Sequence, residues 1–329
     1  MSNKIVLVNA VLHPEAAQRL EEAPNVDAVR PNSTQEMASL LPDAHGIVLG
    51  GYAMGAEQMD QAVRLEVIGR HGAGIDNVDL AAASERGIVV TSTPDGPTES
   101  TAEHTLMLIL AAACRLHQFD KAMRCGDFSV QGCPDNMGCE LRGKRLGIVG
   151  FGRIGRRVAE MCRDALQMSV YVYDPYMARE DIEAWGATPV TDLIDLAREA
   201  DVLSAHMPLT TETYHIISVD VIRAMKPSAI LINAARGPVL DELALIEALQ
   251  DGHLGAVGLD VFDPEPPRSD NPLFDIDRVV LTPHTGSFTY EGRRLMGMTV
   301  VDDVVAVLNG ERPRFAANPE IWARRRVTG

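Results

Sequence analysis

The chain has 329 residues, which is long for one domain and predicts two domains of roughly 100–200 residues each. Hydrophobic residues make up 46% of it and charged residues 23%, as in ordinary globular proteins. The net charge of -16 argues against nucleic acid as a partner, because basic patches bind the phosphates. The longest apolar stretch, Leu106–Cys114, is too short to span a bilayer.

The five cysteines include no CxxC pair and are odd in number, and no signal peptide precedes Lys4. These features predict reduced thiols and a cytoplasmic location. A zinc site formed by Cys125, Cys133 and Cys139 is the alternative, but these residues lack the short ligand spacing of zinc sites. We therefore expect no bound metal.

Short apolar runs alternate with helical patterns in the first third of the chain. The runs are typical of buried parallel strands, and the stretches between them have helical spacing. Strands are predicted at Ile5–Val8, Gly46–Leu49, Val67–Ile68 and Ile88–Val90, with helices such as Gln35–Leu41 and Leu80–Arg86. No glycine turn follows the opening strand. The cluster Pro94–Pro97 contains two prolines and a glycine, which predicts a domain junction.

The chain after this junction opens with one long, largely apolar helix, predicted over Glu99–Leu116. A second set of strand and helix alternations then runs from Leu146 to Leu281, and helical periodicity returns over Glu291–Leu308. Alternating strands and helices are typical of parallel sheets with helices on both faces. The sequence therefore predicts an α/β fold with two doubly wound parallel-sheet domains, of which only the second has a glycine-rich turn.

That turn, Gly150-Phe-Gly-Arg-Ile-Gly155, follows the apolar run Leu146–Val149 and precedes a helical pattern. Asp174 ends the next predicted strand, nineteen positions after Gly155. A strand, a glycine turn, a helix and a later carboxylate form a dinucleotide-binding fingerprint, in which the glycines and the helix N-terminus accommodate the pyrophosphate. Asp174 would accept hydrogen bonds from the ribose hydroxyls and repel a 2′-phosphate, so NAD is expected rather than NADP.

Three charged residues follow strand-like runs in this half: Arg236 ends Ala229–Arg236, Glu265 follows Val257–Pro264, and His284 ends Val279–His284. The carboxyl ends of strands in an open parallel sheet line one crevice, where ligands bind. Arg236 has a planar fork that suits a carboxylate, and His284 can act as acid or base. Glu265 would orient the imidazole and favour its protonated form. Together they predict hydride transfer on a small 2-oxoacid or 2-hydroxyacid.

Each of these residues has an ordinary explanation when taken alone: a surface salt bridge, a loop carboxylate or a structural histidine. Their order on one scaffold makes the joint catalytic interpretation the better one. His284 is the only acid/base candidate expected at a strand end of this half. His104 and His117 are assigned to the long helix, and His206 is expected near the cofactor without a chemical role.

Seven segments resemble the D-isomer-specific 2-hydroxyacid dehydrogenases, the family of phosphoglycerate dehydrogenase and the hydroxypyruvate/glyoxylate reductases. The resemblance runs from about Ile5 to Trp322. The matching segments are GRHGAGIDNVDL (Gly69–Leu80), ESTAEHTLMLIL (Glu99–Leu110), LRGKRLGIVGFGRIGRRVA (Leu141–Ala159), HMPLTTETYHII (His206–Ile217), NAARGPVLDE (Asn233–Glu242), GLDVFDPEPP (Gly258–Pro267) and LTPHTGS (Leu281–Ser287).

This resemblance implies a flavodoxin-like substrate domain formed by residues 1–98 and 291–329, and a Rossmann NAD domain formed by residues 99–290. The helices Glu99–Leu116 and Glu291–Leu308 would form the hinge, and the protein would be a homodimer packed through the NAD domain. The positions that match the family's cofactor site are Gly150, Gly152, Arg153, Ile154, Gly155, Asp174, Met207, Pro208, Thr213, Ala234, Ala235, Arg236, Asp260, His284 and Gly286. Those that match its substrate site are Ala73 and Gly74, in a backbone anion nest, with Arg236 and His284.

The chain departs from phosphoglycerate dehydrogenases at the end of the strand Gly46–Leu49. These enzymes usually have an arginine there for the substrate phosphate, whereas this chain has Gly50-Gly51-Tyr52. A small substrate such as glyoxylate or hydroxypyruvate is therefore expected, and phosphoglycerate dehydrogenase stays an alternative because Arg70 lies nearby in the sequence. Formate dehydrogenases are disfavoured, because they have glutamine where Glu265 stands. An NAD(H)-sensing binding protein of the corepressor type is the alternative outside the enzymes.

Overall fold

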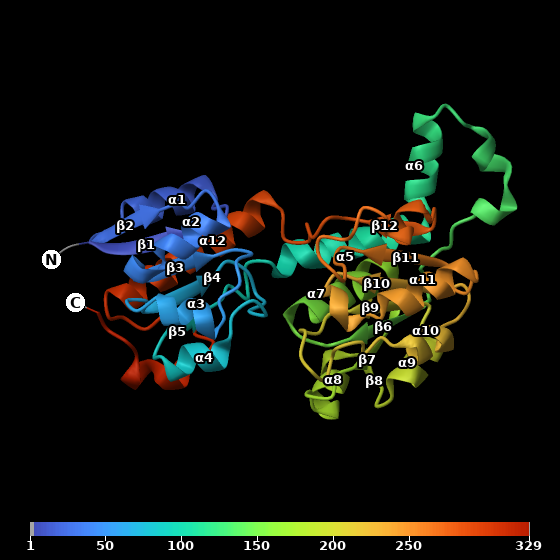
Figure 1. Ribbon diagram of the computed structural model, residues 1–329. Coiled ribbons are helices and arrows are strands. Elements are labelled where there is room, and N and C mark those ends of the chain that lie inside the picture. Colours follow the sequence, from blue (N-terminus) through green and yellow to red (C-terminus); the bar gives the residue numbers. More distant parts are fainter. Residues whose placement is uncertain (1–2, 329) are drawn as a thin grey trace. The chain divides into compact units, whose positions relative to one another are not determined.

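A computed structural model describes residues 3–328 of the chain. The chain divides into two compact units, which we describe separately (Figure 1). The first unit contains the residues up to Thr98 together with those from Ser287 onward, and the second unit is Glu99–Gly286. The second division therefore falls after Gly286, four positions before the expected one at residue 290.

The sheet of the first unit has five parallel strands in the order β2-β1-β3-β4-β5. Its strands are β1 (Lys4–Val8), β2 (Val26–Val29), β3 (Gly46–Leu49), β4 (Val67–Arg70) and β5 (Val89–Thr91). Its helices are α1 (Pro14–Glu21), α2 (Thr34–Leu40), α3 (Ala56–Gln61), α4 (Leu80–Glu85) and α12 (Tyr290–Leu308), with short 3₁₀ helices at Leu41–Asp43 and Pro319–Arg324. This strand order is that of flavodoxin-like folds, as expected from the sequence.

Helices cover both faces of this sheet, which explains why its strands are continuous apolar runs. Val6 and Val8 of β1 pack with α1 and α12 on one face, whereas Leu7 packs with α2, α3 and α4 on the other. The tail after α12 also returns to the sheet. Asn318, which is buried, accepts a hydrogen bond from the N–H of Val90 at 2.9 Å and so ties the tail to β5.

The sheet of the second unit has seven parallel strands in the order β12-β11-β10-β9-β6-β7-β8. Its strands are β6 (Arg145–Val149), β7 (Ser169–Tyr173), β8 (Thr188–Pro189), β9 (Val202–Ala205), β10 (Ile230–Asn233), β11 (Ala256–Leu259) and β12 (Val279–Leu281). Its helices are α5 (Thr98–Ala113), α6 (Leu116–Arg124), α7 (Arg153–Leu166), α8 (Arg179–Trp185), α9 (Leu193–Glu199), α10 (Val219–Ala224) and α11 (Glu242–Gln250). Short 3₁₀ helices lie at Ser129–Gly132, Pro134–Asn136, Gly237–Val239 and Pro272–Asp275.

The strand order of this sheet reverses between β6 and β9, as in Rossmann folds. In open parallel sheets, ligands bind at the carboxyl ends of the strands at such a point. The helices α9, α10 and α11 pack on one face of the sheet, and α5, α7 and α8 pack on the other. Two parallel, doubly wound sheets are thus present, and the predicted fold class is confirmed.

The long helix predicted over Glu99–Leu116 is interrupted. It ends as α5 at Ala113, because Arg115 adopts a left-handed backbone conformation with φ 54°, and a separate helix, α6, begins at Leu116. The expectation that His117 lies on the long helix is therefore wrong, since this residue belongs to α6. Figure 1 shows α6 and the loop after it extending away from the sheet of the second unit.

The strands that precede the three charged residues are shorter than predicted. β10 ends at Asn233, β11 at Leu259 and β12 at Leu281, so Arg236, Glu265 and His284 lie in the loops that follow these strands. The strand-like pattern continued past the strands because apolar residues such as Phe262 are buried within these loops.

Candidate functional site

The loops after β10, β11 and β12 bring the three charged residues together, because these strands are neighbours in the second sheet. Nδ1 of His284 lies 2.5 Å from Oε1 of Glu265. Burial raises the pKa of Glu265, but the hydrogen bond and charge of His284, with the charge of Arg236, outweigh it and hold the pKa below its ordinary value. A carboxylate, an imidazole and a guanidinium therefore act on one another at the carboxyl edge of this sheet.

A close backbone contact joins the loop of Arg236 to the loop of Glu265. A Cβ atom added at Gly237 would lie 1.8 Å from the carbonyl oxygen of Phe262, so no side chain fits at this position. The N–H of Phe262 in turn donates to Oε2 of Glu265 at 3.4 Å. The glycine next to Arg236 thus allows the two charged loops to approach, a role that the sequence analysis did not assign to it.

Asn233 shapes the loop of Arg236 from below, and the sequence analysis missed it. Its side chain is fully buried at the end of β10. Its Oδ1 accepts from the N–H of Ala235 at 3.1 Å, and its Nδ2 donates to the carbonyl of Arg236 at 2.8 Å. The guanidinium of Arg236 is partly exposed, and its Nη1 donates to the carbonyl of Ala235 at 2.7 Å. The loop that contains Ala234, Ala235 and Arg236 is therefore rigidly held.

The loop of His284 is anchored on Asp260. The N–H of His284 donates to the carbonyl of Asp260 at 2.8 Å, and the N–H groups of Thr285 and Gly286 donate to its carboxylate, each at 2.8 Å. His284 has a positive φ of 54°, a conformation that non-glycine residues rarely adopt and that clusters at functional sites. Its imidazole is 46% exposed, whereas the side chain of Asp260 is almost fully buried.

The glycine turn lies between β6 and α7, at the point where the strand order reverses. Gly150 has φ 89°, and a Cβ atom at Gly155 would lie 2.3 Å from the carbonyl oxygen of Gly150. Within residues 3–328, the N–H groups of Gly152 and Ile154 donate to no protein group. Unpaired N–H groups at the start of a fourteen-residue helix fit the phosphates of a dinucleotide, so the residues present suit that cofactor.

Asp174 follows β7 and faces this turn. Its Oδ2 accepts from the N–H of Phe151 at 2.7 Å, and its Oδ1 accepts from the N–H of Tyr176 at 2.9 Å. These bonds fix the carboxylate beside the turn and leave lone pairs for further donors. Arg153 lies within the glycine motif and is the first residue of α7.

The loop after β9 contains the other expected cofactor residues. Thr213 is buried and its hydroxyl donates to the carbonyl of Pro208 at 2.7 Å, which closes the loop that begins at Met207. His206 also follows a strand, directly after β9. Burial lowers the pKa of His206 to about 3, and its Nε2 lies 2.8 Å from the hydroxyl of Ser204, so it is a neutral, engaged imidazole.

In the first unit, the expected anion loop follows β4. Gly72 has φ 150°, and the N–H groups of Ala73 and Gly74 have no protein acceptor in the described part of the chain. Arg70 braces this loop from within: its Nε donates to Oδ1 of Asn77 at 3.1 Å, and its Nη1 donates to the carbonyl of His71. Asn77, which the sequence analysis did not single out, also donates to the loop after β3.

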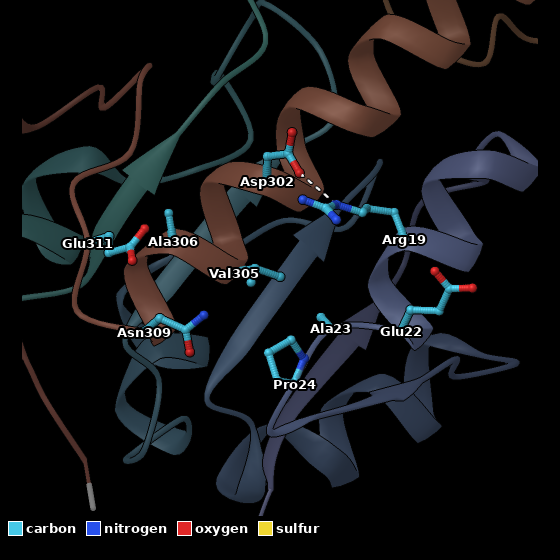
Figure 2. Close-up of a pocket in the computed structure, with 9 residues that line it drawn as sticks. All are labelled: Arg19, Glu22, Ala23, Pro24, Asp302, Val305, Ala306, Asn309 and Glu311. Carbon is cyan, nitrogen blue, oxygen red and sulfur yellow. Dashed lines mark hydrogen bonds and ion pairs between the residues drawn. The ribbon is translucent and has the colours of Figure 1, made fainter.

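A cavity of about 390 Å³ lies elsewhere in the first unit, between α1 and the end of α12 (Figure 2). Arg19 and Asp302 form an ion pair at 3.2 Å beside it. Lys4 donates to the carbonyl of Leu308, so the end of α12 lies at the start of β1, the edge opposite to the carboxyl ends where ligands bind. This cavity is therefore separate from the candidate site.

Residues 3–328 contain neither a metal site nor a membrane-spanning helix. No group of three or more His, Cys, Asp or Glu side chains there is arranged to hold a metal ion. None of the helices in that range is long and apolar enough to cross a membrane.

Comparison with known proteins identifies the family. Residues 106–286 match the model of the D-isomer specific 2-hydroxyacid dehydrogenase NAD binding domain. The glyoxylate reductase of Aeropyrum pernix is 38% identical over 333 aligned residues, which cover 98% of each chain. The chain belongs to the D-isomer-specific 2-hydroxyacid dehydrogenase family. The resemblance seen in the sequence is confirmed, and residues 106–286 are the part that matches the family's NAD binding domain.

Other relatives differ in their substrates and cofactors. The D-3-phosphoglycerate dehydrogenase of Methanocaldococcus jannaschii is 40% identical over 314 residues, which cover 95% of this chain and 59% of that protein. This chain thus spans about three fifths of that relative's length. An NADPH-dependent glyoxylate/hydroxypyruvate reductase from Sinorhizobium meliloti has a structure with a TM-score of 0.86, 31% identity and full coverage of both chains.

Proposed function

We propose that this protein interconverts a small 2-oxoacid and its D-2-hydroxyacid, with NAD(H) as the cofactor and with reduction of a glyoxylate- or hydroxypyruvate-like acid as the favoured reaction. The observation that carries the proposal is the pair of His284 and Glu265, 2.5 Å apart, in the loop cluster that also holds Arg236. An acid/base imidazole next to a carboxylate-binding cation is what reduction of an oxoacid needs.

The residues divide the chemistry as follows. Arg236 binds the substrate carboxylate and polarises the adjacent carbonyl. When bound, the reduced nicotinamide supplies the hydride to C2. His284 gives its Nε2 proton to the carbonyl oxygen as negative charge develops there, and Glu265 stabilises the imidazolium through Nδ1 before that transfer. Oxidation follows the reverse path, with neutral His284 taking the hydroxyl proton.

Backbone N–H groups of the anion loop and of the glycine turn are proposed to bind the substrate and the cofactor. The unpaired N–H groups of Ala73 and Gly74 would receive the substrate carboxylate as an anion nest. Those of Gly152 and Ile154 would receive the pyrophosphate. The other expected cofactor positions are proposed to line the nucleotide.

The acid/base assignment predicts the effect of two substitutions. His284→Ala should lower kcat for glyoxylate reduction by about 10²–10⁴-fold while NADH binding persists. Reduction needs the protonated imidazole, so its rate falls as pH rises. Glu265→Gln removes the carboxylate that pairs with Nδ1 of His284, so it should also lower kcat while NADH binding persists. Stopped-flow kinetics over a pH series and NADH fluorescence titration measure both effects.

The exposed residue His117, on α6, offers a matched control, since His117→Ala should leave both quantities unchanged. Near-normal turnover by His284→Ala would contradict the mechanism. An NAD(H)-sensing binding protein would behave differently from the start: the unaltered protein would bind NADH and consume none with glyoxylate, hydroxypyruvate or other 2-oxoacids.

The preference for NAD over NADP rests on Asp174. Relatives in this family include an NADPH-dependent enzyme, so the choice depends on this chain's own residues. A 2′-phosphate beside the carboxylate would cost on the order of several kcal/mol. Asp174→Asn keeps an oxygen for the N–H of Phe151 but removes the charge, so it should narrow the ratio of kcat/KM for NADH to that for NADPH. Equal use of the two cofactors by the unaltered protein would contradict the assignment.

The preference for an unphosphorylated substrate rests on the loop after β3. Gly50 and Gly51 bring no cation there, and Arg70 is bonded to Asn77 and to the backbone of the anion loop. A phosphate in a poorly solvated cleft needs a cationic partner. The similarity to phosphoglycerate dehydrogenases keeps a phosphorylated substrate as the second candidate.

Side-by-side kinetics decide between these substrates. Hydroxypyruvate should have a higher kcat/KM than 3-phosphohydroxypyruvate. A Cβ atom at Gly51 meets no atom within 4 Å, so Gly51→Arg can be accommodated and should raise kcat/KM for the phosphorylated acid by about tenfold or more through a charged hydrogen bond. Gly51→Gln, which has no charge, should not. If the unaltered protein preferred the phosphorylated acid, the alternative function as a phosphoglycerate dehydrogenase would be supported instead.

A homodimer formed through the second unit is also proposed. No residue of α6 is buried, and its exposed apolar side chains include Leu116 and Met123, followed by Phe128. A second copy of the chain would cover these side chains, as the family resemblance implies.

Sedimentation equilibrium should give the mass of a dimer for the unaltered protein. Phe128→Glu should give the mass of the monomer, whereas Val327→Glu, at an equally exposed site of the first unit, should leave the dimer mass unchanged. A monomer before any substitution would exclude this assembly. The cytoplasmic location stays a prediction.

A further inference from the structure

Three polar side chains from three different elements meet behind the loop of His284. They are His104 on α5, Asp260 after β11 and Thr282 after β12. Nε2 of His104 lies 2.9 Å from the hydroxyl of Thr282 and 3.2 Å from Oδ1 of Asp260. The hydroxyl of Thr282 donates to the same Oδ1 at 2.6 Å. His104 was expected from the sequence only as a residue of the long helix, without a chemical role.

The side chains of this cluster are buried or partly buried, so their polar atoms need hydrogen-bond partners within the protein. The side chain of Asp260 is 2% exposed and that of His104 is 14% exposed. A buried carboxylate is tolerated only when hydrogen-bond donors surround it. Burial raises the pKa of Asp260, but the hydrogen bond from His104 and those from Thr282 and the N–H of Thr285 outweigh it, so the pKa is lower than usual. Asp260 is therefore ionised at neutral pH and depends on its donors.

The hydrogen atoms can be assigned from the network. A hydroxyl has one proton, and the short contact to Asp260 uses that of Thr282. The hydroxyl therefore accepts from His104, whose Nε2 must carry a hydrogen. The neutral Nε2–H form satisfies both contacts, and the ring acts as a donor anchored on a sixteen-residue helix, α5.

Asp260 links these side chains to the loop that contains His284. Its carboxylate accepts from the N–H groups of Thr285 and Gly286, and its carbonyl accepts from the N–H of His284. These contacts enclose the residue with φ 54°, a conformation that persists only where neighbouring contacts enforce it. The direction of the His284 imidazole thus depends on where Asp260 is held.

We propose that His104 is a positioning residue for His284: by donating to Thr282 and Asp260, it fixes loop 282–286 in the shape that directs the imidazole toward Glu265. This inference rests on the proposed function only for its effect on turnover. The effect on the loop itself is a property of the second unit and requires no substrate.

The test compares His104→Leu with His104→Gln. The amide nitrogen of glutamine can replace Nε2 as the donor to Thr282, whereas leucine has no donor. Hydrogen exchange of the Thr285 and Gly286 amides, measured by NMR on protein without nucleotide or substrate, should be faster in His104→Leu and close to normal in His104→Gln. The kcat for glyoxylate reduction should fall by about 10–100-fold in His104→Leu with little change in KM, because misplaced groups lower the rate by such factors.

A matched control is Glu103→Leu, which replaces an exposed side chain next to His104 on α5 and should change neither quantity. If His104→Leu does not fold, His104→Asn provides the same test, because its shorter amide does not reach Thr282. Normal exchange and normal kcat in the variants without a donor would overturn the inference. If the unaltered protein reduces no oxoacid, the proposed function fails, and the exchange measurement alone still decides the role of His104.

Discussion

The contact between Gly237 and the carbonyl of Phe262 is the constraint on which the candidate site depends. Two loops from neighbouring strands approach there more closely than any side chain would permit. Arg236 stands on one of these loops and Glu265 on the other, and the charge of Arg236 helps to keep Glu265 ionised. The acid/base pair in turn requires an ionised Glu265. A position without a side chain thus sets the distance between the charged groups around it.

Buried polar side chains support the exposed charged groups at the carboxyl edge of the second sheet. Buried amides and carboxylates such as Asn233 and Asp260 satisfy backbone groups of the loops, while His284 and Arg236 remain partly exposed for a ligand. A similar division occurs in the first unit, where Asn77 and Arg70 hold the loops and Ala73 and Gly74 are left with unpaired N–H groups. Rigid support beneath exposed groups is the arrangement that precise positioning of a substrate requires.

The sequence was sufficient for the features that depend on local patterns. The glycine turn between Leu146–Val149 and a helix, and the apolar strands covered on both faces, were predictable because periodicity and spacing determine them. The ends of the strands were not predictable from the sequence, since buried loop residues such as Phe262 continue the apolar pattern. The break at Arg115 has no signal either, because its left-handed backbone is enforced by context. Asn233 was missed because its partners are backbone groups of the loop that follows it, which an apolar strand pattern does not indicate. His104 was missed because its partners come from the loops after β11 and β12, and no spacing rule connects them.

The second unit is one continuous stretch of chain inserted into the first, and this affects the order in which the two units can complete their folding during synthesis. The strands β1, β3, β4 and β5 leave the ribosome early, but α12, which covers one of their faces, follows only after the whole second unit. Val6, Val8 and their neighbours on that face therefore lack the cover of α12 while the intervening residues are synthesised. A nascent chain in that condition exposes apolar surface and strand edges, which favours aggregation and chaperone binding. The second unit has no such delay, because all seven of its strands are contiguous in the chain.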